Sequence, residues 1–516
     1  MKKSVQKFYG NPSKLVWIVM LFFVCLLASN KAYAEEADKS LMSVTNHQIT
    51  VGDQKLSYTA TVGFIPILDE KTNQVSAEIF FVYYKVDNKK NKSSRPVTFA
   101  FNGGPGSASM FLHLGAFGPR TIPHSLDGTQ LLPPPYDVVD NETTLLEFTD
   151  LVFYDPVGTG YSHTVGDFDP HLFWGVKEDI KCVTEFIRQF LIKENRLSSP
   201  VVIAGESYGG VRSAGLAKSL QDAGIYPNAI IMVSPVLDLE TIQWSSMGDK
   251  AILLSMPAYT AVAWYHKKIA THLQGDLEVV LEDVRNWTKE VLLPAFWDGN
   301  SLTSEDKNAL AKKMSEYIGV SAEWILSKNF RIWEDDYCTE ILRSEGKSIS
   351  VYDGRSTALG PYTGDENDQV MFNYSGALKT AMAQYLQNEL NFYTNRVYHS
   401  GNAEVYLDWN WESGRPAAFS PDTINPGYPD VSHFLSQALR RCDFLKVFIA
   451  SGIYDLECPY DSVVYSINHL DLTEERLKNI DIKTYPGGHM LYFNPEARQM
   501  LKNDLHYFYE QVKLVK

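Results

Sequence analysis

Residues 200–210 read PVVIAGESYGG, and this stretch decides the fold. Pro200 to Ala204 form a short, continuously apolar run, which is typical of a strand that is buried on both faces. A helical pattern follows from Gly210 to Ala223. The residues between them fit G-x-S-x-G, in which the two glycines permit a sharp turn that lifts the serine hydroxyl above the sheet. Ser207 is therefore the candidate nucleophile.

Similar apolar runs occur on both sides of this stretch. A helical pattern at 177–193 precedes the strand before Ser207, and residues 56–84 resemble an antiparallel hairpin region. Strands that alternate with helices predict an α/β fold with a doubly wound, mostly parallel sheet. The further candidate strands are residues 96–101, 150–154, 229–234, 445–451 and 481–485.

Two residues late in the chain are candidates for the base and the acid that a serine nucleophile needs. After a strand-turn-helix serine, the acid and then the base follow in chain order. His489 is the one histidine of twelve that lies in a Gly-rich turn directly after a late buried strand. Asp455 also ends a buried strand, whereas Asp443 lies before that strand and Asp461 well past it. We therefore predict a Ser207, Asp455 and His489 triad.

A glycine-rich loop follows the first of the parallel strands. It reads FNGGPGS from Phe101 to Ser107. Such a loop can supply a backbone N–H to an oxyanion, together with the N–H of the residue after the nucleophile. A simple tight turn is the alternative interpretation. A phosphate-binding loop is excluded because the Gly-Lys-Ser/Thr ending is absent.

Residues 241–425 differ from the rest of the chain in their sequence pattern. Trp, Tyr and Met are scattered through helical patterns such as Ala251 to Thr271 and Leu378 to Phe392, and strand runs are lacking. We predict an inserted helical region that caps the active site, with a second independent domain as the alternative. The α/β core then comprises residues 35–240 and 426–516.

The first 34 residues have the pattern of a signal peptide. Four lysines precede an apolar run from Leu15 to Ala28, and Ala32-Tyr33-Ala34 supplies a small-x-small cleavage site. The run is shorter than the roughly 20 residues of a spanning helix, which argues against a membrane anchor. We expect export to the periplasm or out of the cell, cleavage near Glu35, and no stable membrane insertion afterwards.

Charge and cysteine content limit the partners and cofactors. The net charge is −15, so nucleic acid is a poor candidate partner. C-x-x-C and H-E-x-x-H are both absent, so we expect no metal site, and nothing implies a cofactor. An exported chain lies in a compartment that permits disulfides, so we expect at least one bridge among four cysteines: Cys182, Cys338, Cys442 and Cys458.

Five motifs in order resemble those of the serine carboxypeptidase family, whose members have the α/β-hydrolase fold. The differences from the usual family pattern resemble those of a bacterial-type branch. The motifs are Asn102 to Gly106, Asp155 to Ser162, Gly205 to Gly210, Gly452 to Asp455 and Gly488 to Met490.

The resemblance implies a role for four further residues. Gly104 and Tyr208 would supply the oxyanion-hole N–H groups, and Asn102 and Glu206 would bind the free carboxylate of a peptide substrate. Ala116 stands where the family usually has a second glutamate, which leaves strict C-terminal preference open. An esterase or acyltransferase with the same triad is the alternative function. A catalytically idle binding protein is a more distant one, because the triad is complete.

Overall fold

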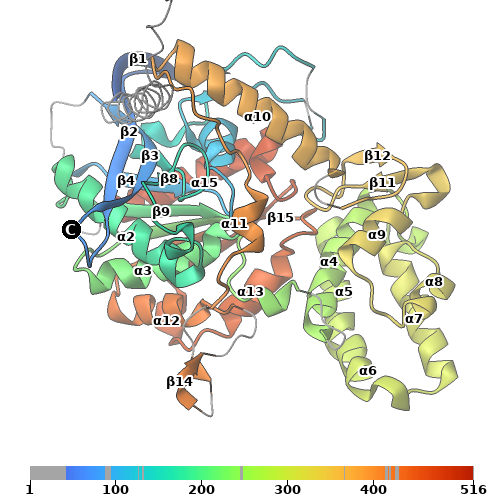
Figure 1. The fold of residues 1–516 in the computed structure, drawn as a ribbon. Coiled ribbons are helices and arrows are strands. Elements are labelled where there is room, and N and C mark those ends of the chain that lie inside the picture. Colours follow the sequence, from blue (N-terminus) through green and yellow to red (C-terminus); the bar gives the residue numbers. More distant parts are fainter. Residues whose placement is uncertain are drawn as a thin grey trace, which may run out of the picture.

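The computed structural model describes residues 42–514 apart from 88–93, 126, 131–132, 244–247, 365–366, 413–415, 418–419 and 425–428. The expected signal peptide, residues 1–34, lies outside the described residues. A central sheet with helices on both faces forms the main body, and a helical lobe lies beside it (Figure 1). Within the described part of the chain, no helix is both long and apolar enough to cross a membrane.

The central sheet has ten strands, and its order is β1-β2-β3-β7-β4-β9-β10-β15-β16, with β8 paired to β3. The pairs from β7 to β16 are all parallel, and β1, β2 and β3 add antiparallel neighbours at one edge. The doubly wound, mostly parallel sheet is therefore confirmed. The parallel strands are β4 (Val97–Phe101), β7 (Asp150–Tyr154), β9 (Val201–Glu206), β10 (Ala229–Val233), β15 (Lys446–Gly452) and β16 (Ile480–Tyr485).

The antiparallel edge agrees with the predicted hairpin and extends it. β2 (Gln54–Leu68) pairs with β3 (Val75–Val86), and β1 (Ser43–Val51) adds a strand that the sequence pattern did not indicate. Most side chains of β1 are exposed or half-buried, so the strand lacks the apolar run by which the others were recognised. The short strand β8 (His163–Thr164) pairs with β3 at this edge, and β5 (Arg120–Thr121) and β6 (Val139–Asp140) form a separate two-stranded sheet.

Two hydrophobic cores cover the two faces of the sheet. Along β9, Val202 and Ala204 belong to one core, while Val201 and Ile203 belong to the other. This alternation explains why the strand is apolar throughout, since both of its faces are buried. Helices α10 (Gln369–Asn388) and α15 (Pro495–Leu514) pack into the first core, and the second core includes side chains of α2 (Val176–Lys193), α3 (Gly209–Asp222), α12 (Ser432–Arg441) and α13 (Tyr460–Asn468).

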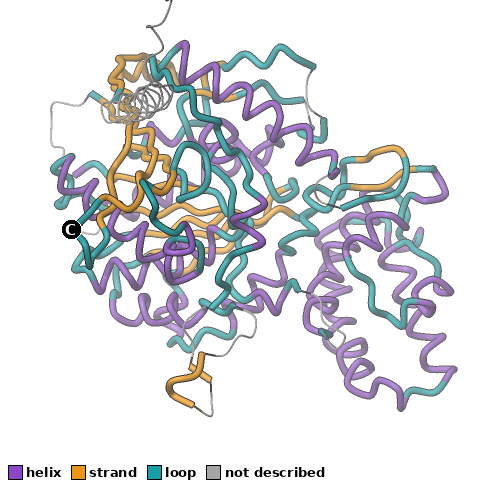
Figure 2. The backbone as a smooth tube through the Cα atoms, viewed as in Figure 1, coloured by secondary structure: helices purple, strands orange, loops and turns teal. Residues whose placement is uncertain are grey.

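The predicted helical insertion divides between two places. Its first part forms the lobe beside the sheet and has its own hydrophobic core (Figures 1 and 2). The lobe also contains a short antiparallel pair, β11 (Lys347–Ile349) and β12 (Thr357–Leu359), which the sequence pattern did not indicate. The lobe helices are α4 (Asp249–Tyr265), α5 (Leu277–Trp287), α6 (Leu293–Asp298), α7 (Ser304–Ile318), α8 (Ala322–Ser327) and α9 (Glu334–Glu340).

The second part of the insertion returns to the main body. Side chains of α10 belong to the first core of the sheet, and Val405 of α11 (Ala403–Leu407) belongs to the second. A second small antiparallel pair, β13 (Pro416–Ala417) and β14 (Ser420–Ile424), follows α11. Only the first part of residues 241–425 therefore has a core of its own.

The expectation of a disulfide is wrong. No disulfide joins any of the four described cysteines, and all four are buried. Each lies in a hydrophobic core, Cys338 in that of the lobe and the other three in the second core of the sheet. Each therefore packs as a small apolar side chain, which is the usual behaviour of a buried thiol. Burial raises the pKa of Cys182 and Cys458, so these two thiols stay protonated.

Candidate active site

Ser207 lies at the tip of a sharp turn between β9 and α3. Its φ angle is 59°, in the left-handed region that few non-glycine residues adopt. The backbone around it leaves no room for side chains, because a Cβ on Gly205 would lie 2.3 Å from the carbonyl oxygen of Gly209. The Ser207 N–H donates to the carbonyl of Val233 at 3.0 Å, which fixes the turn to β10. The strained serine conformation is the one that G-x-S-x-G predicts.

Asp455 and His489 are brought together by two neighbouring parallel strands. Asp455 follows β15 and His489 follows β16, so both lie where the carboxyl ends of the strands meet. The distance between His489 Nδ1 and Asp455 Oδ2 is 2.9 Å, and both side chains are buried. Asp455 Oδ1 also accepts from the N–H of Cys458 at 2.9 Å, which orients the carboxylate.

The electrostatics of this pair follow from its burial. Burial raises the pKa of Asp455, although the neighbouring His489 opposes this shift. Burial disfavours a protonated His489, but the Asp455 carboxylate outweighs it and raises the pKa of the imidazole well above its usual value. A carboxylate that stabilises an imidazolium in this way is the second requirement of a serine triad.

The serine and histidine loops are connected through Ser234. The Ser234 hydroxyl donates to the carbonyl of His489 at 2.8 Å, and Ser234 directly follows Val233, which holds Ser207. Among the described residues no direct hydrogen bond joins Ser207 Oγ to His489. The structure therefore pairs the histidine with the aspartate and places the serine on the adjoining loop.

The glycine-rich loop after β4 lies directly against the serine turn. A Cβ on Gly103 would lie 2.5 Å from the backbone nitrogen of Tyr208, so only glycine fits here. Gly104 has a φ of 105°, which also favours glycine. Among the described residues, no backbone carbonyl accepts a hydrogen bond from the N–H of Gly104 or of Tyr208. Both predicted oxyanion donors are therefore near one another and have no backbone partner.

Arg212 anchors the glycine-rich loop through the backbone of Asn102. Its guanidinium pairs with Asp179 at 2.6 Å and donates to the carbonyl of Asn102 at 2.7 Å. The Asn102 side-chain oxygen also accepts from the N–H of Leu112 at 3.0 Å. These bonds fix the Asn102 amide so that its NH₂ group points to Glu206, to which it donates.

Glu206 has a second side-chain partner, which no sequence pattern indicated. The hydroxyl of Tyr492 lies 2.8 Å from one carboxylate oxygen of Glu206 and 2.9 Å from the other. Burial raises the pKa of Glu206 to about 7, although His489 and the bonds from Tyr492 and Asn102 favour the ionised form. Sequence reasoning missed Tyr492 because it is 286 residues from Glu206 and lies in no recognised motif.

A segment of the lobe braces the loops that contain Asp455 and His489. The carbonyl of Tyr352 accepts from the His489 N–H at 2.6 Å, and the carbonyl of Val351 accepts from the Leu456 N–H at 3.0 Å. A Cβ on Gly488 would lie 2.2 Å from the Tyr352 carbonyl oxygen, so this contact requires glycine. The lobe is thus connected to the residues around Asp455 and His489.

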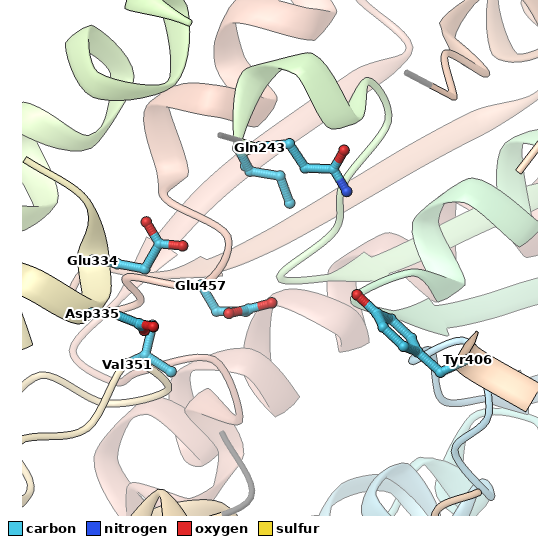
Figure 3. A pocket seen from close by; sticks show the side chains of 7 residues that line it. Gln243, Glu334, Asp335, Val351, Tyr406 and Glu457 are labelled. Atoms are coloured by element: carbon cyan, nitrogen blue, oxygen red, sulfur yellow. The ribbon is translucent and has the colours of Figure 1, made fainter. Parts of the chain in front are cut away.

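A pocket of about 420 Å³ lies between the lobe and the main body. Glu457, two residues after Asp455, lies in the middle of its lining, with Glu334 and Asp335 on one side and Tyr406 on the other (Figure 3). Gln243, Ile242 and Val351 complete the lining. The described residues contain no group of three or more His, Cys, Asp or Glu side chains that could hold a metal ion.

Comparison with known proteins identifies the family of this chain. A family model described as serine carboxypeptidase matches residues 52–490. Pheromone-processing carboxypeptidase KEX1 of Saccharomyces cerevisiae is 31% identical over 161 residues, which cover 29% of this chain and 20% of that protein. Serine carboxypeptidase-like 20 of Arabidopsis thaliana is 26% identical over 215 residues, which cover 40% of this chain and 39% of that protein.

A solved structure shows the same fold. The crystal structure of Kex1(delta)p, a prohormone-processing carboxypeptidase from Saccharomyces cerevisiae, superposes with a TM-score of 0.54 at 17% identity. The superposition covers 88% of this chain and 91% of that one. The chain spans well under half the length of the curated relatives that it matches, since the aligned parts cover 20% and 39% of the two proteins above.

Proposed function

Because this chain belongs to the serine carboxypeptidase family, we propose that it is a serine-type carboxypeptidase that removes residues from the C-terminus of peptides. The observation that carries this proposal is the buried Asn102 and Glu206 pair directly beside the Ser207 turn. These groups suit a free carboxylate, and the backbone carboxylate of a peptide belongs to its last residue.

The catalytic step uses Ser207, His489 and Asp455. His489 takes the proton of the serine hydroxyl, and the oxygen attacks the last peptide carbonyl. Asp455 holds the imidazole and stabilises its positive charge. The N–H groups of Gly104 and Tyr208 donate to the oxyanion of the tetrahedral intermediate. His489 then gives the proton to the leaving amine, and water releases the acyl group from the enzyme.

Recognition of the substrate carboxylate depends on a protonated Glu206. A neutral carboxyl group donates a hydrogen bond to a carboxylate, whereas an ionised one repels it. The Asn102 amide, fixed by Leu112 and Arg212, supplies the second donor. Since burial raises the pKa of Glu206 to about 7, the site accepts a peptide carboxylate best at acid to neutral pH.

The lobe serves as a cap beside this site. Lobe residues Glu334 and Asp335 and main-body residues Tyr406 and Glu457 line one pocket next to the triad. The carbonyls of Tyr352 and Val351 accept hydrogen bonds from the N–H groups of His489 and Leu456, and these bonds hold the lobe against the catalytic loops. A peptide would then lie with its last bond at Ser207 and its preceding residues toward this pocket.

The alternative is an esterase or acyltransferase that uses the same triad. One observation favours it: Glu206 is only 2% exposed, and Tyr492 already contacts both of its oxygens. With Ala116 in place of a second glutamate, the carboxylate site is less complete than the family pattern. Both alternatives share one acyl-enzyme chemistry and differ in the acyl substrate.

A comparison of three substrates tests the proposal. Below pH 7, where Glu206 is mostly protonated, a blocked dipeptide with a free C-terminus should have a kcat/KM about ten- to a hundredfold above that of its C-terminal amide, because a hydrogen bond to a charged group contributes about 1.5–3 kcal/mol. Turnover of a simple ester alone would instead support the esterase. Failure on all three substrates would support a binding protein.

We also propose that the protein is exported to the periplasm or secreted, on the strength of the charged, apolar and small-residue pattern in residues 1–34. Protein isolated from its own host should lie outside the cytoplasm and begin near Glu35, as determined by N-terminal sequencing. Recovery from the cytoplasm with Met1 still present would contradict this proposal.

A further inference from the structure

Tyr492 contacts Glu206 in the proposed active site, although the chemistry of the triad does not require this tyrosine. Tyr492 is the middle residue of η11 (Leu491–Phe493), which directly follows the catalytic His489 loop. Its side chain is fully buried, and its hydroxyl reaches both carboxylate oxygens of Glu206 at 2.8 and 2.9 Å. A tyrosine hydroxyl so placed is either a donor to an ionised Glu206 or a partner of the neutral acid.

The ring of Tyr492 lies against the segment that contains Ala116. A Cβ on Gly115 would lie 2.8 Å from Tyr492 Cε2, so the ring is in close contact with the backbone of η2 (Phe111–Phe117). Ala116 ends in a methyl group and cannot place a carboxyl group beside Glu206. Instead of a carboxyl group at position 116, this region of the structure places the hydroxyl of Tyr492 beside Glu206.

We infer that Tyr492 is the positioning residue of the substrate-carboxylate site: its hydroxyl holds Glu206 beside Asn102 and favours the ionised form of Glu206, so that it limits peptide hydrolysis at high pH. This inference rests on the proposed carboxypeptidase function. Tyr492 thus contacts Glu206 where a second acid would otherwise do so, and it has the opposite effect on the protonation of Glu206. A second acid would hold a shared proton in the site, whereas a phenol donates and leaves Glu206 ionised.

The groups around Glu206 agree with a donor role for Tyr492. Burial raises the pKa of Tyr492 well above its usual value, so the phenol stays protonated and donates. Arg498 of α15 favours the ionised phenol, but its effect is smaller than that of burial. The other groups that act on Glu206 are His489 and Asn102, which lower its pKa, and Asp455, which raises it.

The Tyr492→Phe variant should therefore change the pH dependence in one direction. Loss of the donor removes a bond that favours ionised Glu206, so the pKa of Glu206 rises further. Peptide hydrolysis, which needs protonated Glu206, should then continue to a pH about one unit higher than in wild type. Hydrolysis of the corresponding peptide amide does not use Glu206, so its pH profile should stay in place.

The experiment measures kcat/KM from pH 4 to 10 for a blocked dipeptide and its amide, in wild type, Tyr492→Phe and the control Tyr374→Phe. Tyr374 is also a buried tyrosine of the same core, but its hydroxyl donates to the carbonyl of Gly128 at 3.1 Å. Only Tyr492→Phe should shift the alkaline limb, and only for the peptide. Equal profiles in all three proteins, or a shift common to both substrates, would overturn the inference.

Two further measurements keep the inference testable if Tyr492→Phe folds poorly. Replacing Tyr492 by 3-fluorotyrosine keeps the ring and strengthens the donor, so the peptide limb should move to lower pH. In the double variant Glu206→Gln with Tyr492→Phe, the shift should vanish, because position 206 no longer carries an ionisable group. If wild type shows no hydrolysis of the dipeptide that depends on Ser207, the proposed function fails instead. If that hydrolysis is present and no limb moves, only the role of Tyr492 fails.

Discussion

Ser207→Ala, His489→Ala and Asp455→Asn should each remove nearly all turnover while the fold stays intact. Loss of the serine or the histidine should lower kcat about 10⁶-fold, because members of a triad act as a unit. Asp455→Asn should lower kcat about 10⁴-fold, because an amide in contact with His489 Nδ1 favours the wrong tautomer. The 2.9 Å contact between His489 and Asp455 is the geometric basis of this expectation.

Asp461→Asn is the matched control for the acid. Asp461 lies six residues further along the chain and pairs with Arg285 of the lobe at 2.8 Å rather than with His489. Its variant should therefore retain the turnover of wild type. Steady-state kinetics on an ester substrate and circular dichroism of each variant would decide the matter. Wild-type rates in Asp455→Asn, together with a large loss in Asp461→Asn or Asp443→Asn, would show that the acid is assigned wrongly.

Glu206→Gln should separate peptide hydrolysis from amide hydrolysis by its pH dependence. The pKa of Glu206 is raised to about 7 by burial, so the group is mostly protonated below this pH and ionised above it. In wild type, kcat/KM for the blocked dipeptide should then fall about tenfold for each pH unit above 7. The amide lacks the repelled carboxylate, so its kcat/KM should not show this fall.

Glutamine keeps a donor toward the substrate and has no charge at any pH. In Glu206→Gln the ratio of peptide to amide kcat/KM should therefore become nearly constant, with a gain of about a hundredfold over wild type at pH 9. The acid limb should remain for both substrates, since a protonated His489 cannot act as the base. One common profile for peptide and amide in wild type, unchanged by the mutation, would remove the main support for a carboxypeptidase.

Much of the fold could be predicted because most of the parallel strands are recognisable in the sequence as short apolar runs. Residues 201–206 and 446–452 are apolar at nearly every position, since one core contacts the odd residues and another the even ones. The strand β1 was missed because most of its side chains are exposed or half-buried. The expected disulfide was wrong because an oxidising compartment permits a bridge but does not bring two cysteines together.

The part of the candidate site that directly follows the strands could be predicted from the sequence. Ser207 and Asp455 each follow a recognisable apolar run, whereas His489 follows the half-buried edge strand β16, in which only Tyr485 is buried. Chain order then predicts the place of each residue in the triad. The glycine motifs of the Asn102 loop and of the serine turn were also evident in the sequence, and the structure shows that close backbone contacts require glycine at Gly103 and Gly205. These features depend on local sequence, so a single chain is sufficient to identify them.

Only the tertiary structure decided which side chains meet Glu206 and how the insertion is used. Tyr492 contacts Glu206 although 286 residues separate them, and residues 351 and 352 of the lobe contact the loops that contain Asp455 and His489. Neither contact leaves a periodic or motif signal in the sequence. Sequence patterns report which face of an element is buried, because burial repeats with the period of the helix or strand. They do not report which polar groups share a buried site, because that depends on packing between elements far apart in the chain.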